Sequence, residues 1–182
     1  MKPLSLLPLL LAVPFAVLAA PLKTDPANSS VTAVFRQMNV PVEGVFKRFT
    51  ASVDYDPAKP HASKADVQID ATTLDVGDEE INKEVGKKEW FNTAQYPRAS
   101  FVSTAIRPAA AGKLTVDGKL TIKGRTANVS FPLSVRQVGG KYLFEGQLPI
   151  RRTAFNVGEG DWLDTSMVAD EVIIKFRVTA AK

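Results

Sequence analysis

Few residues in this chain have the types and the spacing that catalysis requires. The 182 residues include no cysteine and one histidine, His61. Thiolate nucleophiles, cysteine-based zinc or iron–sulfur sites and paired-histidine metal sites are therefore excluded. His61 lies in the proline-rich segment Asp-Pro-Ala-Lys-Pro-His-Ala-Ser, which is typical of a solvated turn. We predict no metal site and no catalytic role for it.

Three other groups of polar residues resemble sites in composition only. Asp78–Glu80 could supply paired carboxylates, but a helix that starts there would favour the same negative charge. The hydroxyl residues of segment 100–104 have no histidine to complete a triad. Gly158-Glu159-Gly160 is too short for a phosphate-binding loop, and no dinucleotide fingerprint occurs. The sequence therefore predicts no catalytic residues and no catalytic cofactor, and we expect a protein that is not an enzyme.

The charge distribution argues against nucleic-acid binding. The formal net charge is +4 and the sequence pI is about 9.3, but lysines and arginines are spread along the chain among acidic residues. A nucleic-acid site needs its basic residues gathered on one face.

The N-terminus has the pattern of a secretory signal. Lys2 precedes an apolar run over 4–18 that Pro8 and Pro14 interrupt, and Val17-Leu18-Ala19 offers small residues to a signal peptidase. A membrane-spanning helix needs ~20 apolar residues without such breaks. We expect residues 1–19 to be removed and residues 20–182 to form one exported domain without a stable membrane anchor. With no cysteine at the cleavage point, a lipoprotein anchor is excluded.

Elsewhere the dominant pattern is an alternation of apolar and polar residues. Val129, Phe131, Leu133 and Val135 alternate with polar neighbours, as in a strand with one buried face. Turn residues separate such runs, and one segment, Asp78–Lys88, has a helical charge order. We predict an all-β fold with this short helix between strands 3 and 4 of eight up-and-down antiparallel strands, at about 29–38, 42–55, 64–73, 99–107, 113–122, 126–137, 141–151 and 170–180.

Eight such strands can form a sandwich or a closed barrel, and a barrel can hold one small ligand. Periodicity alone leaves open whether the inward apolar side chains fill a core or line a cavity. The side chains that we place inside are Phe35, Phe49, Val53, Ile69, Phe101, Leu120, Ile122, Phe131, Phe144, Leu148 and Ile174.

Four motifs carry a family resemblance over about residues 24–180. They are Val-Glu-Gly-Val-Phe-Lys-Arg-Phe at 42–49, Lys-Glu-Trp-Phe-Asn at 88–92 with Tyr-Pro-Arg-Ala-Ser-Phe-Val-Ser-Thr at 96–104, Val-Asp-Gly-Lys-Leu-Thr-Ile-Lys-Gly at 116–124, and Arg-Thr-Ala-Phe-Asn-Val-Gly at 152–158. In this order they resemble the YceI family of bacterial periplasmic lipid-binding proteins. Histidines that many members carry near the first strands are absent, so no histidine-dependent contact is carried over.

The resemblance implies a lipocalin-like barrel in the periplasm, whose apolar cavity holds a polyisoprenoid, such as the chain of a ubiquinone, or a fatty amphiphilic lipid. It places Trp90 and Phe91 near the barrel mouth and adds Phe155 to the candidate cavity lining. Two alternatives remain: a filled barrel that acts as a stress or interaction protein, and, less favoured, an enzyme acting on a lipid in the barrel. The oligomeric state stays open, a dimer included, and transient membrane contact is compatible with the fold.

Arg152 is the candidate for contact with a lipid head group. It lies where a predicted strand ends, and a guanidinium offers five donors in a fixed fork. The alternative, which we weigh slightly higher, is a salt bridge that pins this loop to the acidic segment Asp164–Asp170.

Overall fold

The computed structural model describes residues 21–110 and 112–181, and the expected signal peptide at 1–19 lies outside them. The described chain contains a short helix, α1 (Glu79–Val85), and eleven strands. In chain order the strands are β1 (Lys23–Thr24), β2 (Ser30–Gln37), β3 (Val40–Phe46), β4 (Phe49–Asp54), β5 (Lys64–Asp70), β6 (Leu74–Asp75), β7 (Arg98–Pro108), β8 (Lys113–Ile122), β9 (Arg125–Val138), β10 (Lys141–Arg151) and β11 (Val168–Ala181).

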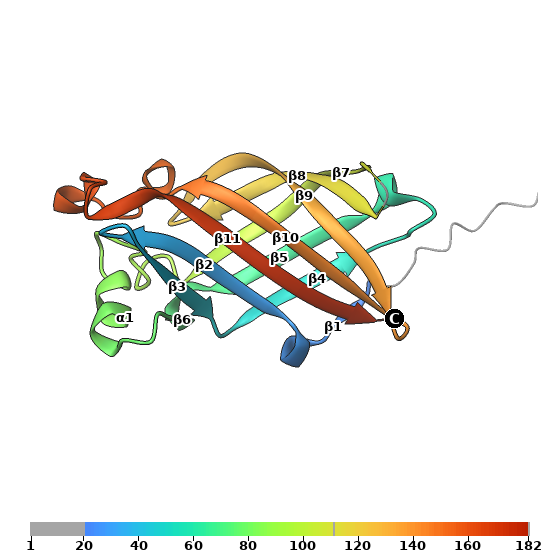
Figure 1. Cartoon of the computed structure of the whole chain (residues 1–182), viewed down its shortest axis with the longest axis horizontal. Helices are drawn as coiled ribbons and strands as arrows, with labels where there is room; N and C mark the ends of the chain where they lie inside the picture. The colour runs from blue at the N-terminus through green and yellow to red at the C-terminus, as the bar shows by residue number, and fades with distance from the viewer. Residues whose placement is uncertain (1–20, 111, 182) are drawn as a thin grey trace, which may run out of the picture.

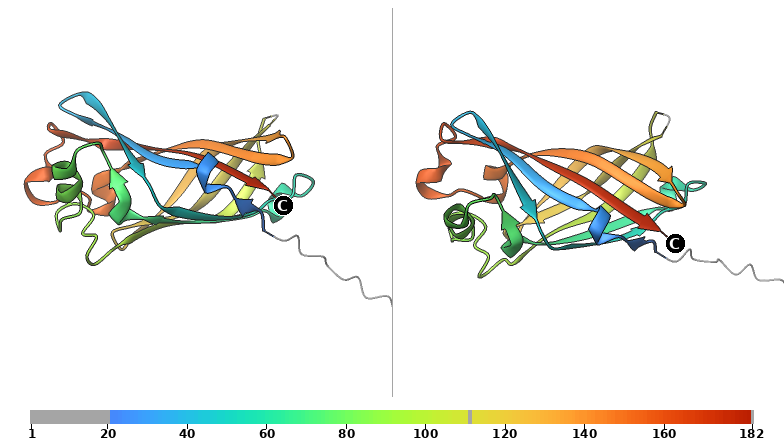
Figure 2. Two further views of the ribbon diagram at one scale, coloured as in Figure 1. Left: turned by 90° about the horizontal axis from the view of Figure 1, so that it is seen from below. Right: turned by 60° about the horizontal axis from the view of Figure 1, so that its bottom comes forward.

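The strands form one antiparallel sheet that curls into a lipocalin-like barrel (Figure 1, Figure 2). Its strand order is β4-β5-β7-β8-β9-β10-β11-β2-β3-β6, and β1 pairs with β11. β4 and β3 lie near opposite ends of this strand order. The chain connects them directly, because β3 continues into β4 through Lys47 and Arg48. Leu22, next to β1, also bridges Val53 of β4. The predicted all-β, antiparallel barrel with one short helix is confirmed. The described residues form eleven strands where eight are predicted, and α1 follows four long strands rather than three.

The second predicted strand, 42–55, is wrong in one respect: it is two strands, β3 and β4. In β3 the buried residues occupy even positions, Gly44 and Phe46, whereas in β4 the inward side chains occupy odd positions, Phe49 and Ala51. The inward phase reverses at the exposed pair 47–48, which belongs to neither strand. This break lets the segment leave the partnership with β2 and pair with β5.

The helix is shorter than the predicted Asp78–Lys88. The Asp78 side chain caps its start by accepting from the backbone N–H of Glu80 at 2.8 Å and of Ile81 at 3.1 Å. The helix stops at Gly86, after which the chain turns tightly through residues 87–96. The acidic cluster therefore serves the helix N-terminus. Strand β5 likewise ends at Asp70, whose side chain caps the turn 71–73.

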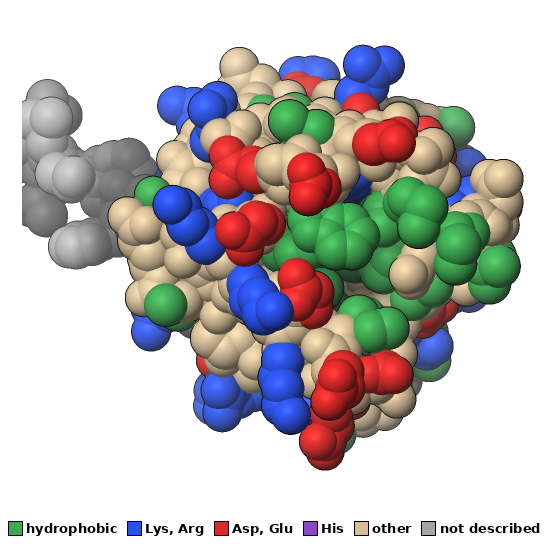
Figure 3. Space-filling model, turned by 90° about the vertical axis from the view of Figure 1, so that its left-hand side faces the viewer, with side chains coloured by type: hydrophobic (Ala, Val, Ile, Leu, Met, Phe, Trp, Pro, Cys, Tyr) green, Lys and Arg blue, Asp and Glu red, His purple; other side chains and the backbone are tan. Residues whose placement is uncertain are grey.

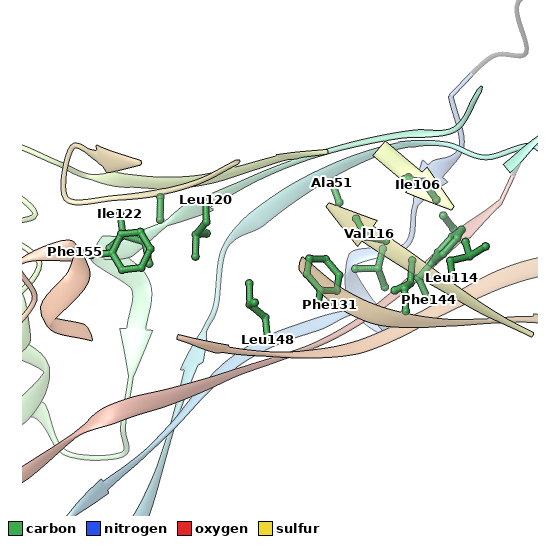
Figure 4. Close-up of a cluster of buried hydrophobic side chains, with 14 of the residues drawn as sticks. Ala51, Ile106, Leu114, Val116, Leu120, Ile122, Phe131, Phe144, Leu148 and Phe155 are labelled. Atoms are coloured by element: carbon green, nitrogen blue, oxygen red, sulfur yellow. The ribbon is translucent and has the colours of Figure 1, made fainter. Parts of the chain in front are cut away.

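The barrel has two distinct ends. Helix α1 and the segments 86–97 and 152–167 gather at one end, which we call the α1 end, while strand β1, the β9–β10 turn and the end of β11 lie at the other (Figure 1). Buried side chains occupy the space between them: Phe155 and Ile122 lie toward the α1 end, and Ile106, Leu114 and Phe144 lie toward the other (Figure 4). Within the described residues no helix is long and apolar enough to cross a bilayer.

Candidate ligand-binding cavity

An apolar cavity of about 120 Å³ lies inside the barrel. We call it the inner cavity. Because every strand turns alternate side chains inward, its wall is built from both sides of the curled sheet. Residues from nearly all the long strands line it: Val31, Ala51, Val53, Asp54, Tyr55, Ser63, Ala65, Val67, Ile69, Phe101, Ile106, Leu114, Val116, Leu120, Phe131, Leu133, Phe144, Leu148, Ile174, Phe176 and Val178.

Three phenylalanine rings form an arc along one side of the inner cavity. The ring centroids of Phe101 and Phe131 lie 5.4 Å apart, and those of Phe131 and Phe176 lie 5.3 Å apart. The outer two rings lie against glycines on the neighbouring strands. A Cβ added to Gly118 would come within 2.4 Å of the Phe101 ring, and one added to Gly146 within 2.3 Å of the Phe176 ring. These glycines therefore give the rings room to lie along the wall.

The few polar groups of the inner cavity lie at its end away from α1. Tyr55 packs edge-on against Tyr142 and Phe144, with ring centroids 5.2 Å and 5.4 Å away. Burial raises the pKa of the Tyr55 phenol above its ordinary value, so this group stays neutral at physiological pH. The buried Ser63 hydroxyl accepts from the backbone N–H of Asp56 at 3.3 Å. Tyr55 and Ser63, together with Asp54, are the polar part of the cavity lining.

A second cavity, of about 150 Å³, lies at the α1 end, and we call it the mouth cavity. It is lined by Ala33, Phe35, Gln37, Leu74, Ile81, Glu84, Val85, Trp90, Phe91, Arg152, Val157, Trp162, Val168 and Val172. Figure 3 looks onto this end and shows hydrophobic side chains gathered between charged side chains of both signs.

A small apolar cluster connects the walls of the two cavities. Phe46 and Leu74 form its buried centre together with Val31. Phe49 and Phe91 pack against this centre, and the Phe46 and Phe91 rings meet edge to face at 6.4 Å. Because Val31 lines the inner cavity while Leu74 and Phe91 line the mouth cavity, the cluster stands between them. We call Phe46, Phe49 and Phe91 the partition.

Arg152 is the most heavily bonded side chain of the α1 end. It is 2% exposed, and its guanidinium donates five hydrogen bonds of 2.6–3.2 Å, all to backbone carbonyls. The acceptors are the carbonyls of Val157, Gly158, Trp162, Val168 and Ala169. A guanidinium has five N–H groups, so none is left for a ligand.

The geometry of Arg152 corrects the expected salt bridge. The ion pairs among the described residues do not include this guanidinium. The link to the acidic segment is made by the next residue, since the Thr153 N–H and hydroxyl donate to the Asp170 carboxylate at 3.1 Å and 2.8 Å. The loop is thus attached to the acidic segment, but through backbone carbonyls that bind Arg152 and through the neutral side chain of Thr153. Burial lowers the pKa of Arg152, which a guanidinium tolerates while remaining charged.

A second buried cation fastens the same loop. Lys123, in the β8–β9 turn, donates from Nζ to the Asn156 carbonyl at 2.6 Å and to Glu159 Oε2 at 2.7 Å. The hydrogen bond from Lys123 holds the pKa of Glu159 below its usual range. The backbone N–H groups of Gly158 and Glu159 both donate to the Glu89 carbonyl at 2.8 Å. Segments 86–97 and 152–167 therefore form one connected cap over the mouth cavity.

The structure divides the sequence-predicted lining residues among three places. Those on the inner cavity are Val53, Ile69, Phe101, Leu120, Phe131, Phe144, Leu148 and Ile174. Those on the mouth cavity are Phe35, Trp90, Phe91 and Arg152. Phe49, Ile122 and Phe155 line neither cavity and pack in the apolar core.

Sequence reasoning did not single out Phe176 or Trp162, nor the polar end formed by Tyr55 and Ser63. Phe176 belongs to an alternating run, so its spacing could have identified it. Trp162 follows a glycine-rich loop with no periodicity, and no local signal places it. His61 lies exposed in the turn 60–62. Across the described ranges, no three histidine or acidic side chains gather as a metal site would require.

Comparison with known proteins identifies the family. A family model described as a YceI-like domain matches residues 22–180. The chain belongs to the YceI family. The crystal structure of Burkholderia cenocepacia BcnA is 52% identical and superposes with a TM-score of 0.86, covering 87% of this chain and 100% of BcnA.

Two more distant proteins extend the comparison. A UPF0312 protein of Shewanella oneidensis is 30% identical over 129 residues, which cover 69% of this chain and 65% of that protein. A Saccharophagus degradans structure, described as a polyisoprenoid binding domain implicated in plant cell wall breakdown, has a TM-score of 0.67 at 18% identity. That match covers 90% of this chain and 98% of the domain, and it shows the shared fold.

Proposed function

We propose that this YceI-like chain binds the long apolar chain of an isoprenoid or a fatty amphiphile inside its barrel and carries it without making or breaking a bond. The observation that carries the proposal is the inner cavity, whose wall is apolar apart from one end. Each CH₂ removed from water contributes ~0.8 kcal/mol, so a long chain gains affinity without specific polar contacts. The description of the Saccharophagus domain as polyisoprenoid binding supports this ligand class.

The proposal includes export and loading at a membrane. The signal-like sequence at 1–19 supports a periplasmic location. At the α1 end, the side chains of Met38, Ile81, Leu163 and Met167 are exposed. The Met38 N–H donates to the Met167 carbonyl at 2.8 Å, so two of these segments lie side by side. This apolar rim is next to the mouth cavity, and transient contact with a bilayer would let a lipid enter without crossing water.

Native mass spectrometry of the protein purified from the periplasm tests the carrier function. We expect an added mass that corresponds to one lipid, released by organic extraction, and N-terminal sequencing that begins at Ala20. Bare protein that also takes up no added isoprenoid would leave the filled-barrel alternative. An intact Met1 would refute the export.

A matched pair of variants locates the bound lipid. Ala51 is buried and lines the inner cavity, whereas Ser52, the next residue of β4, is exposed on the outer face. Ala51→Leu should lower lipid occupancy because it fills part of the cavity, and Ser52→Leu should leave it unchanged. Equal occupancy in the two variants would place the lipid elsewhere.

A further inference from the structure

One buried polar group at the α1 end has no partner. Trp90 is 8% exposed, and its indole N–H finds no hydrogen-bond acceptor within the described part of the chain. A buried donor left unpaired is destabilising, and native proteins contain few such groups. This indole belongs to the wall of the mouth cavity. The unsatisfied donor therefore points to an acceptor that the chain itself does not supply.

The surrounding side chains hold the Trp90 ring in place. The Arg152 guanidinium carbon lies 5.6 Å from the ring centroid, in cation–π range, and the Trp162 ring lies 5.1 Å away. Because five carbonyl bonds fix the guanidinium, the ring that contacts it is fixed as well. Arg152 is thus a positioning residue.

Water is a poor partner for this donor. A buried water typically makes two to four hydrogen bonds to polar groups, and most of the mouth cavity wall is apolar. The guanidinium of Arg152 has no free N–H to offer it. The remaining polar side chains of the wall are Gln37 and Glu84. The two charged side chains of the wall are engaged elsewhere, Glu84 with Lys87 and Arg152 with backbone carbonyls, which favours an uncharged ligand group over an anion.

We propose that the mouth cavity holds the head of the bound amphiphile, and that Trp90 Nε1–H donates a hydrogen bond to an uncharged acceptor oxygen of that head, a carbonyl or an ether. This inference rests on the proposed function, which places the apolar tail in the inner cavity. The tail passes the partition, where the Phe91 ring contacts both the cluster and the mouth cavity. Specificity would then come from a single donor at the mouth.

The test compares two isoprenoid probes, ubiquinone, whose head carries carbonyl oxygens, and squalene, a hydrocarbon without oxygen. The chain has two tryptophans, so an indole ¹⁵N–¹H spectrum contains two side-chain peaks, which Trp162→Phe assigns. We expect ubiquinone to shift the Trp90 indole proton downfield and squalene to leave it near its free position. Trp90→Phe should weaken ubiquinone binding about fivefold to tenfold, as for about 1–1.4 kcal/mol, and leave squalene binding unchanged.

The possible results separate the head-group contact from the carrier function. Trp162→Phe is the matched control, because it changes the neighbouring ring and keeps the Trp90 donor. Equal weakening of both probes by Trp90→Phe, or no downfield shift in the wild-type protein, would overturn the head-group contact while leaving the carrier function standing. If neither probe binds the wild-type protein, the carrier function itself fails. The spectrum of the wild-type protein gives an answer even if Trp90→Phe does not fold.

Discussion

Replacing Arg152 by methionine tests whether this residue holds the cap together or contacts a ligand. Methionine retains much of the apolar length of arginine but removes every donor. Three of the five acceptor carbonyls, those of Val157, Gly158 and Val168, are bonded in fully buried surroundings. In the variant these carbonyls have no donor within reach and must stay unpaired or draw the loop open to water.

The expected loss of unfolding free energy in Arg152→Met can be estimated from those three carbonyls. An unsatisfied buried acceptor costs about 1–3 kcal/mol, and at the lower limit three of them cost about 3 kcal/mol. For a domain of this size that loss lowers the melting temperature by about 6–12 °C. Circular dichroism during thermal unfolding measures it, and hydrogen exchange should show lost protection in segment 156–168. Arg152→Lys should rescue little, because an ammonium cannot reproduce the planar fork.

The refuting result is specific. If Arg152→Met leaves the melting temperature within about 1 °C of wild type and weakens binding of a polar-headed lipid while sparing a hydrocarbon of similar length, the carbonyl network is not stabilising and the head-group role returns. A clear drop in melting temperature with both ligands weakened alike would retire the head-group role.

Three further outcomes follow from named contacts. Phe131→Glu should abolish lipid co-purification in a protein that still folds by circular dichroism, because an unpaired charge in the apolar cavity is costly; full occupancy would place Phe131 outside the binding site. Gly146→Ala should destabilise the barrel by about 1–3 kcal/mol in urea unfolding, because its Cβ would lie 2.3 Å from the Phe176 ring; an unchanged midpoint would show that the ring moves freely. The hydrogen bond from Lys47 holds the pKa of Asp75 far below its ordinary value, so the folded state gains stability above the unfolded pKa of about 3.9 and loses it as the pH falls below that value. Asp75→Asn should flatten this acid-side loss of unfolding free energy, and an unchanged slope would contradict it.

The long strands and their order could be predicted because their signal is local. Alternation in β8, β9 and β11 fixes which side chains face inward, and the turns at Lys123-Gly124 and Gly139-Gly140 fix where the chain reverses. The motifs then add the family assignment, which periodicity cannot supply.

The change of the inward-facing positions from even to odd at Lys47 and Arg48 is hard to predict from alternation, because each half of the segment alternates correctly on its own. One signal was available: Phe46 and Phe49 are three residues apart, and an unbroken strand would turn them to opposite faces. The two-residue strands β1 and β6 carry no period at all. They exist only because β11 and β3 offer them partners.

The role of Arg152 could not be read from the sequence for a different reason. Nearby acids favour a salt bridge on proximity alone, whereas the folded loop turns its carbonyls inward around the guanidinium. Gly158 makes this possible, with φ at +83° and a position where a Cβ would come within 2.1 Å of an Arg152 nitrogen. Three of the carbonyls that accept from Arg152 lie ten to seventeen residues further along the chain. They can be identified only once the folded loop brings them to the guanidinium.

The two buried cations of the cap therefore respond differently to pH. Arg152 binds carbonyls, which do not titrate, so its contacts persist as long as the loop is folded. Lys123 binds the Glu159 carboxylate as well as a carbonyl, and protonation of Glu159 removes the charged half of that contact. Because the pKa of Glu159 lies below its usual value, this contact contributes stability above the unfolded pKa of about 4.3 and weakens only as the pH falls further. Acid should thus loosen the cap first at the Lys123 side, while the Arg152 side still orients the Trp90 ring.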